Sequence, residues 1–294
     1  MRSETATDRS RFGPIDADRL YRTSAAGMWR SMAFVYRYVR TLLRRPIGLL
    51  WLLGFPAGFY LLTIATFIDF STIPAEYHGA VRATTALSYG VFGSILVSLT
   101  TVSGGLLSDL ETDRFGLFRA IGIHPWMDLL GRVCAGLLAA AVSAGVVVAV
   151  SLLTGANYTF TAVDAPIVIG AFFASVVPWI AIAYFVAIIT SSRRYATLIA
   201  VSVALAAYFA TGFNGSVPAT FTADPEWLNV LPNTLSTRLL VGSLVGIEDA
   251  SGAGLTPPEL PDGTAALGLL STYAIVSLGA LGVLTRRLYD GRLR

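Results

Sequence analysis

The sequence predicts an all-α, polytopic integral membrane protein with six transmembrane helices, an N-terminal amphipathic interface helix and short re-entrant helices between the last two spans. Composition is the first reason. Apolar residues make up 54% of the 294 residues and charged residues only 13%, about half the roughly 25% typical of a soluble domain. The mean hydropathy is +0.66. The second reason is six windows of at least 20 residues without Asp, Glu, Arg or His, each long enough to cross a bilayer core about 30 Å thick.

The composition also excludes several kinds of active site. All 21 basic residues are arginine, which excludes a Walker A phosphate loop, a Schiff base and a lysine general base. The single Cys134 cannot form an internal disulfide. His78 and His124 fall on opposite sides of the expected membrane, and no metal-ligand cluster is present. We therefore expect no cofactor, metal or ATPase site in this chain, and no nucleic-acid partner.

The N-terminal region divides into a tail and a helix. Residues 1–27 carry many charges and no apolar core of a signal peptide, so we expect a cytoplasmic tail. Residues 28–45 give an apolar stripe at 100° per residue and predict an amphipathic interface helix on the inner membrane surface. Its arginines would face lipid phosphates or a cytoplasmic subunit, and the sequence does not decide between the two. The arginines on this face are Arg30, Arg37, Arg40 and Arg44.

The six-helix transmembrane domain is predicted over residues 46–285, followed by a cytoplasmic tail over 286–294. Its spans are expected at about 46–68, 83–108, 129–153, 166–190, 195–214 and 265–285. Nineteen of the 21 arginines then lie on the side that holds both termini, with only Arg82 and Arg238 on the other. By the positive-inside rule, this distribution predicts a multi-pass protein of the cell membrane with both termini in the cytoplasm.

The loop over residues 109–132 is the longest on the inner side. Gly116 permits a break after the second span, and Pro125 is favourable as the first residue of a helix that continues into the third span. The loop therefore predicts a turn, a short helix and another turn. A simple connection needs fewer residues, so we interpret it as an element that transmits force from a motor. A solvated hairpin remains the alternative.

Two features lie on the expected outer side. Residues 226–247 are long enough to span, but a seventh span would place Arg238 near the membrane centre at a cost of roughly 2.5–3.5 kcal/mol. Pro232 also interrupts a continuous helix. We therefore expect two short helices that dip into the outer leaflet or cap the outer mouth of the transmembrane domain. Glycosylation sequons begin at Asn157 and Asn214.

The spans contain no ionisable residue deep in any apolar window, whereas ion-coupled carriers usually keep one there. This disfavours a proton-driven pump or an ion channel with a charged filter.

The order of these elements resembles the type-2 permease family of ATP-binding-cassette (ABC) exporters, from residue 28 to the end of the chain. An amphipathic helix precedes six spans, and the loop after the second span is similar to the family's charged, glycine, short-helix and proline pattern. Between the last two spans, a stretch resembles the family's outer re-entrant region, with Pro232, Arg238 and Gly242. The loop residues that carry the resemblance are Glu111, Asp113, Arg114, Phe115, Gly116, Phe118, Arg119 and Pro125.

The resemblance implies a permease that pairs with a second permease, identical or different, and with two copies of a separate ABC ATPase subunit. ATP and Mg would be used by that partner. Residues 111–124 would supply the coupling helix, and residues 28–45 the interface helix beside it. The path would run between the permeases, lined mainly by the first, second and fifth spans.

Other functions stay open. The chain could be a non-transporting membrane anchor or assembly protein, or, less favoured, a secondary carrier. The exported substrate could be a drug, a lipid, a glycan or an ion.

Overall fold

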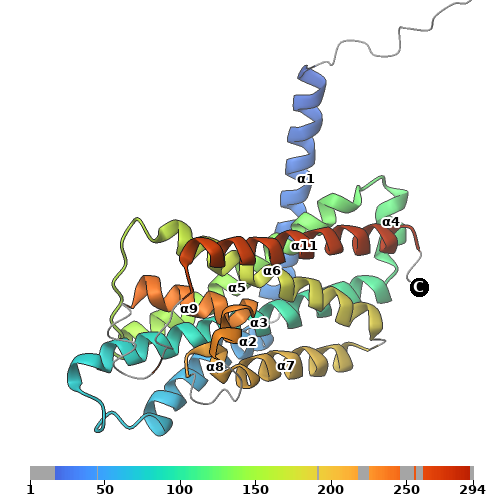
Figure 1. Cartoon of the computed structure of the whole chain (residues 1–294). Helices are drawn as coiled ribbons and strands as arrows, with labels where there is room; N and C mark the ends of the chain where they lie inside the picture. The colour runs from blue at the N-terminus through green and yellow to red at the C-terminus, as the bar shows by residue number, and fades with distance from the viewer. Residues whose placement is uncertain are drawn as a thin grey trace, which may run out of the picture.

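The computed structural model describes residues 17–44, 46–190, 192–217, 225–245, 255 and 261–291, with the backbone alone for residues 17–28, 30 and 47. These ranges contain helices and no strand, which confirms the all-α prediction. Figure 1 shows most of the long helices running side by side along one axis, with α1 nearly at right angles to them. The helices are α1 (Ala17–Leu43), α2 (Pro46–Leu62), α3 (His78–Glu111), α4 (Arg114–Ala120), α5 (Pro125–Leu153), α6 (Ala165–Ile189), α7 (Arg193–Ala210), α8 (Gly212–Gly215), α9 (Pro232–Leu244) and α11 (Gly263–Tyr289).

Among the described residues, five segments are long and apolar enough to cross a membrane. They are Gly48–Phe67, Ala75–Glu111, Pro125–Leu153, Ala165–Ile189 and Gly263–Tyr289. This is compatible with a multi-pass membrane protein. The fifth predicted span, at about 195–214, corresponds to α7 and is not among these segments. Helix α7 is 18 residues long and begins with two arginines, so it is shorter and less apolar than the other five.

The boundaries of α1 differ from the expected ones. The helix begins at Ala17, inside the stretch predicted as a tail, and ends at Leu43. Residues 1–16 of that tail lie outside the described residues.

Helix α3 lies at the centre of the bundle and is buried along most of its length. It packs against α2, α5, α6 and α7. At Gly93, an added Cβ would lie 2.6 Å from the Oγ of Ser143 on α5 and 2.9 Å from the Cγ of Pro56 on α2. A glycine at this position therefore allows three helices to meet at close range.

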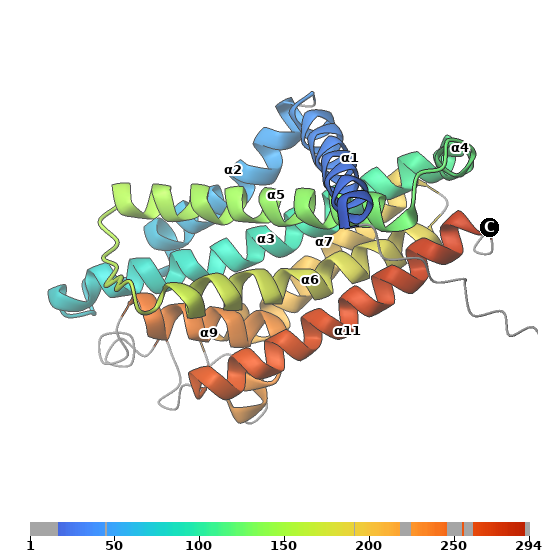
Figure 2. The ribbon, with the colours of Figure 1, turned by 90° about the horizontal axis from the view of Figure 1, so that it is seen from above.

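Figures 1 and 2 place the same elements at the two ends of the bundle. Helix α4 lies at one end, with the start of α7 and the C-terminal end of α11, and we call this the α4 end. Helices α8 and α9 lie at the other, the α9 end. Segments rich in arginine therefore gather at the α4 end.

A left-handed turn follows α7 at the α9 end. Gly212, Phe213, Asn214 and Gly215 have φ angles of 65°, 55°, 56° and 75°, a conformation that costs a non-glycine residue roughly 1–2 kcal/mol. The Asn214 amide donates to the Ser88 carbonyl at 3.1 Å, and its Oδ1 accepts from Asn233 at 2.9 Å. Asn214 is fully buried, so its sequon is inaccessible in the folded chain. Asn157 of the other sequon is exposed.

Two short helices occupy the region predicted to hold a pair, a 3-10 turn over Pro225–Asn229 and α9. Pro232 is the first residue of α9, where its missing N–H leaves no hydrogen bond unmade. Arg238 is 1% exposed and Gly242 is half-buried. The surrounding helices therefore enclose Arg238, whose exposure to lipid would be costly.

Candidate functional site

Helix α1 crosses α5 at very short range near the α4 end. A Cβ added to Gly131 would lie 2.4 Å from the Cβ of Phe34 and 3.2 Å from its carbonyl carbon. Only a residue without a side chain lets the two backbones approach so closely. One turn further along α1, the Tyr38 hydroxyl donates to the Asp128 carboxylate at 2.5 Å.

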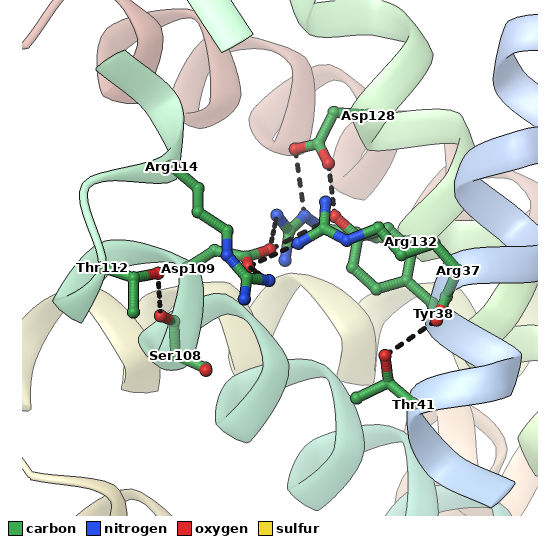
Figure 3. Close-up of polar contacts among 9 residues, drawn as sticks. All are labelled: Arg37, Tyr38, Thr41, Ser108, Asp109, Thr112, Arg114, Asp128 and Arg132. Atoms are coloured by element: carbon green, nitrogen blue, oxygen red, sulfur yellow. Dashed lines mark hydrogen bonds and ion pairs between the residues drawn. The ribbon is translucent and has the colours of Figure 1, made fainter. Parts of the chain in front are cut away.

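A buried ionic cluster lies beside this crossing, around the carboxylate of Asp109 at the end of α3 (Figure 3). Its Oδ1 accepts from the Nη2 of Arg37 at 2.6 Å and from the Nη1 of Arg114 at 2.7 Å. Its Oδ2 accepts from the Nη2 of Arg132 at 2.6 Å. We call the six residues the Asp109 cluster: Arg37, Tyr38, Asp109, Arg114, Asp128 and Arg132.

A second carboxylate completes the cluster. The Nε of Arg132 donates to Asp128 at 3.0 Å, four residues earlier on α5. Asp109, Asp128 and Arg132 are only 2%, 0% and 3% exposed. Burial raises the pKa of the Tyr38 hydroxyl well above its usual value, so Tyr38 stays neutral and remains a donor.

Aromatic rings cover the guanidinium groups. The guanidinium carbon of Arg37 lies 5.1 Å from the ring centres of both Tyr38 and Phe118, and that of Arg132 lies 4.7 Å from the ring of Tyr38. These distances suit cation–π attraction, which is strongest where water is excluded.

The cluster links four helices, because Asp109 belongs to α3 and its arginines come from α1, α4 and α5. Removing one partner of a buried ion pair typically costs about 3–5 kcal/mol, since the other charge is left uncompensated. The α4 end is therefore a unit in which α4 cannot easily move without α1, α3 and α5.

Helix α4 begins differently from the prediction. Gly116 was expected to supply the break after the second span, and this is wrong, because Gly116 lies inside α4. The break falls at Thr112 and Asp113, where Asp113 adopts a φ of 46°. Aspartate tolerates this left-handed conformation better than most residues. Gly116 instead leaves room for the Asp113 carboxylate, which would lie 2.9 Å from an added Cβ.

The two sides of α4 differ. Phe115 and Phe118 are buried, whereas Leu117 and Ile121 are 58% and 61% exposed. The apolar residues in and next to α4 therefore divide between an inner and an outer face. An exposed leucine and isoleucine on a helix this short form a surface suited to a protein partner.

The inner face of α4 also contacts the end of α11. The ring centres of Phe115 and Tyr289 are 5.3 Å apart, edge to face. The Nη1 of Arg119 donates to the Tyr289 carbonyl at 3.1 Å. Glu111, the last residue of α3, is exposed beside α4. Pro125 is the first residue of α5, as the sequence predicts.

The predicted interface arginines do not share one face. Arg37 points into the protein toward Asp109, so the prediction that it faces lipid or a partner is wrong; the helical wheel cannot reveal a buried carboxylate on another helix. Arg40 is exposed and lies over the ring of Tyr36 at 5.9 Å, and Arg44 is also exposed. The side chain of Arg30 lies outside the described residues.

A cavity of about 460 Å³ opens beside the Asp109 cluster, between α1, α2, α3 and α7. Arg37, Asp109, Arg114 and Arg193 line it together with many apolar residues. Within the described ranges, no group of three or more His, Cys, Asp or Glu residues could hold a metal ion.

The sequence analysis missed Tyr38, Asp109, Asp128 and Arg132 as members of a site. A signal was present, since Asp128 and Arg132 stand four residues apart on a predicted helix and Asp109 directly follows an apolar window. Charges that border apolar windows of adjacent spans have few partners except one another.

No protein-family model matches the sequence, and no curated protein matches it either. We therefore infer function from the geometry of the chain.

Proposed function

We propose that this chain is the transmembrane permease subunit of an ATP-driven exporter, and that α4 transmits the work of a separate ATPase subunit to the spans. The observation that carries the proposal is the set of contacts that attach α4 to the long helices. Its inner face contacts α1, α3, α5 and α11 through the Asp109 cluster and Tyr289, while Leu117 and Ile121 face outward. A push on the outer face would therefore reach four long helices at once.

In this proposal α7 also spans the membrane, as the fifth span in chain order, and makes six spans together with α2, α3, α5, α6 and α11. It packs along the central helix α3, and its N-terminal end, which begins with Arg193 and Arg194, lies at the α4 end. The positive-inside rule then puts the α4 end in the cytoplasm, with both termini, and makes the α9 end the outer side of a cell membrane. Helix α9 would be the re-entrant element, and α1 the interface helix.

The partners follow from what the chain lacks. Without lysine there is no Walker A loop, so two ABC ATPase subunits would bind the ATP and Mg. A second permease copy, identical or different, would complete the path. The surface of α2 supports this, because Cβ atoms added at Gly54 and Gly58 would meet nothing within 4 Å. Two small residues four apart let a neighbouring transmembrane helix approach closely.

The test is ATP-driven export from vesicles that contain the chain and its co-purified ATPase. Leu117→Ser, Ile121→Ser and Glu111→Ala should each reduce export several-fold without lowering the amount of folded protein. Leu153→Ser, at an equally apolar position that is 87% exposed at the α9 end, is the matched control. Normal export in all three variants in and beside α4 would refute the coupling role. Absence of any ATPase from the native complex would favour an anchor or assembly protein.

One observation favours a second candidate, a proton-coupled carrier. Asp109 and Asp128 are buried within segments able to span a membrane, and carriers use such carboxylates to bind protons. Both carboxylates already accept from Arg132, so a carrier would have to break these ion pairs before either oxygen could bind a proton. Proton uptake into vesicles that contain the chain alone would support the carrier.

A further inference from the structure

We propose that the cavity between α1, α2, α3 and α7 binds an anionic amphiphile, a molecule with one acidic headgroup such as a phosphate and an apolar tail. The inference rests on the proposed function in one respect, since it names the substrate class of the same export path. The binding itself can be tested without an ATPase.

The polar end of the cavity carries an excess of positive charge. Arg37, Arg114 and Arg193 line it, with Asp109 as the acidic residue among them. Including Arg132 and Asp128 directly behind, four arginines face two aspartates, a net charge of +2. Unbalanced charge of this kind next to an apolar space favours the binding of an anion.

Two of these arginines retain free donors. The Nη1 of Arg37 is buried and has no hydrogen-bond partner in the described part of the chain, although its Nη2 is bound to Asp109. The guanidinium of Arg193 makes no ion pair with any described residue. Both side chains line the same cavity, so an acidic headgroup there would be attracted by both positive charges.

The rest of the cavity is mostly apolar, with a few hydroxyl groups among its lining residues. Leu49, Leu52 and Phe55 of α2 line it opposite Leu96 of α3 and Val201 of α7. Its volume of about 460 Å³ falls within the range of about 300–1,000 Å³ that small-molecule sites occupy. A Cβ added at Gly104, which also lines the cavity, would meet nothing within 4 Å, so α3 leaves this space open.

The two parts of the cavity together define the ligand class. A free inorganic anion would satisfy the arginines but leave the apolar walls uncovered. A neutral lipid would cover the walls but leave the excess charge. Only a molecule with both parts satisfies the whole cavity.

The experiment measures binding to the purified full-length chain in a neutral detergent by native mass spectrometry. The probes are phosphatidylglycerol, phosphatidylcholine, dodecyl phosphate and inorganic phosphate. We expect phosphatidylglycerol or dodecyl phosphate to bind at least about tenfold more tightly than phosphatidylcholine and inorganic phosphate. Retention of phosphatidylglycerol identifies a membrane lipid as the source, and retention of dodecyl phosphate alone identifies a diffusible amphiphile.

Matched variants locate the site. Arg193→Gln should weaken binding about tenfold, whereas Arg194→Gln, the exposed neighbour that does not line the cavity, should not. Gly104→Leu should fill the cavity and abolish binding. Gly268→Leu, at an equally open position on α11, should leave binding unchanged.

Equal binding of phosphatidylcholine and phosphatidylglycerol, equal binding of inorganic and dodecyl phosphate, or equal effects of the two arginine variants would overturn the inference. Binding at this site without ATP-driven export would remove the exporter proposal and leave the ligand class standing. ATP-driven export that is unaffected by Arg193→Gln and Gly104→Leu would remove the proposed ligand class and leave the exporter proposal standing.

Discussion

Replacing Asp109 with asparagine is the sharpest test of the Asp109 cluster. Asparagine has nearly the same shape and keeps one acceptor oxygen, so it removes charge with little change in packing. Three guanidinium groups lie within 2.7 Å of the two carboxylate oxygens in the native chain. In Asp109→Asn, Arg132 would keep Asp128 as its acidic partner, and Arg37 and Arg114 would lose theirs.

The size of the effect follows from burial. The side chains of Arg37 and Arg114 are 28% and 43% exposed, so both can turn partly toward water and their ion pairs count for less. Arg132 is 3% exposed and cannot turn toward water. Breaking a pair this deeply buried typically costs about 3–5 kcal/mol, and we expect Asp109→Asn to fall in that range.

The assay is thermal unfolding of the purified chain in detergent, followed by tryptophan fluorescence. A loss of about 3–5 kcal/mol should lower the midpoint by roughly 6–20 °C. Asp113→Asn is the matched control, because Asp113 is exposed and asparagine also tolerates its left-handed backbone. If the midpoint of Asp109→Asn stays within about 2 °C of that control, the cluster does not hold the helices together.

Three further changes should have measurable effects on stability. Gly131→Ala should cost about 1–3 kcal/mol in chemical denaturation, because its methyl group would overlap the α1 side chain beside it, whereas Gly145→Ala, where an added Cβ meets nothing within 4 Å, should not destabilise the chain. Gly215→Ala should cost about 1–2 kcal/mol against the same Gly145→Ala control, since alanine disfavours a φ of 75°; an unchanged midpoint would show that the turn relaxes. Hydrogen bonds from Thr264 lower the pKa of Asp262, the N-cap of α11, so its contribution to stability is present above the usual aspartate pKa of 3.8 and is lost as the pH falls through the lower folded value. The difference in melting temperature between the native chain and Asp262→Ala should therefore shrink in acid, and a constant difference down to about pH 2 would contradict the capping role.

The sequence predicted the helical class and the approximate positions of α2, α3, α5, α6, α7 and α11, because apolar windows and their charged borders are local features. It did not predict that α1 begins inside the expected tail. Pro125 begins a helix as expected, since the preference of proline for the first turn is also local. Pro232, expected only to break a continuous helix, also begins one. The expected break at Gly116 was wrong, because Asp113 can take the same left-handed conformation and its position decided the turn.

The sequence pattern could not predict which residues pair between different helices. The arithmetic of the helical wheel put Arg37 on an outward face, but it could not show that Asp109, 72 residues later, would meet it. The number of spans likewise depends on α7. Because this helix is 18 residues long and begins with two arginines, its length and hydropathy alone do not decide whether it crosses the membrane.

The left-handed turn after α7 constrains how that helix can vary. A chain of L-residues cannot propagate such a turn, so the last residue of α7 is tied to Gly212 and cannot shift along the sequence. An insertion within α7 would have to emerge at its other end, with a rotation of about 100° for each residue added. That rotation would turn Arg193 away from the cavity between α1, α2, α3 and α7 that it lines. Among related sequences, the arginine at the start of the helix and the left-handed turn at its end should therefore be kept or lost together.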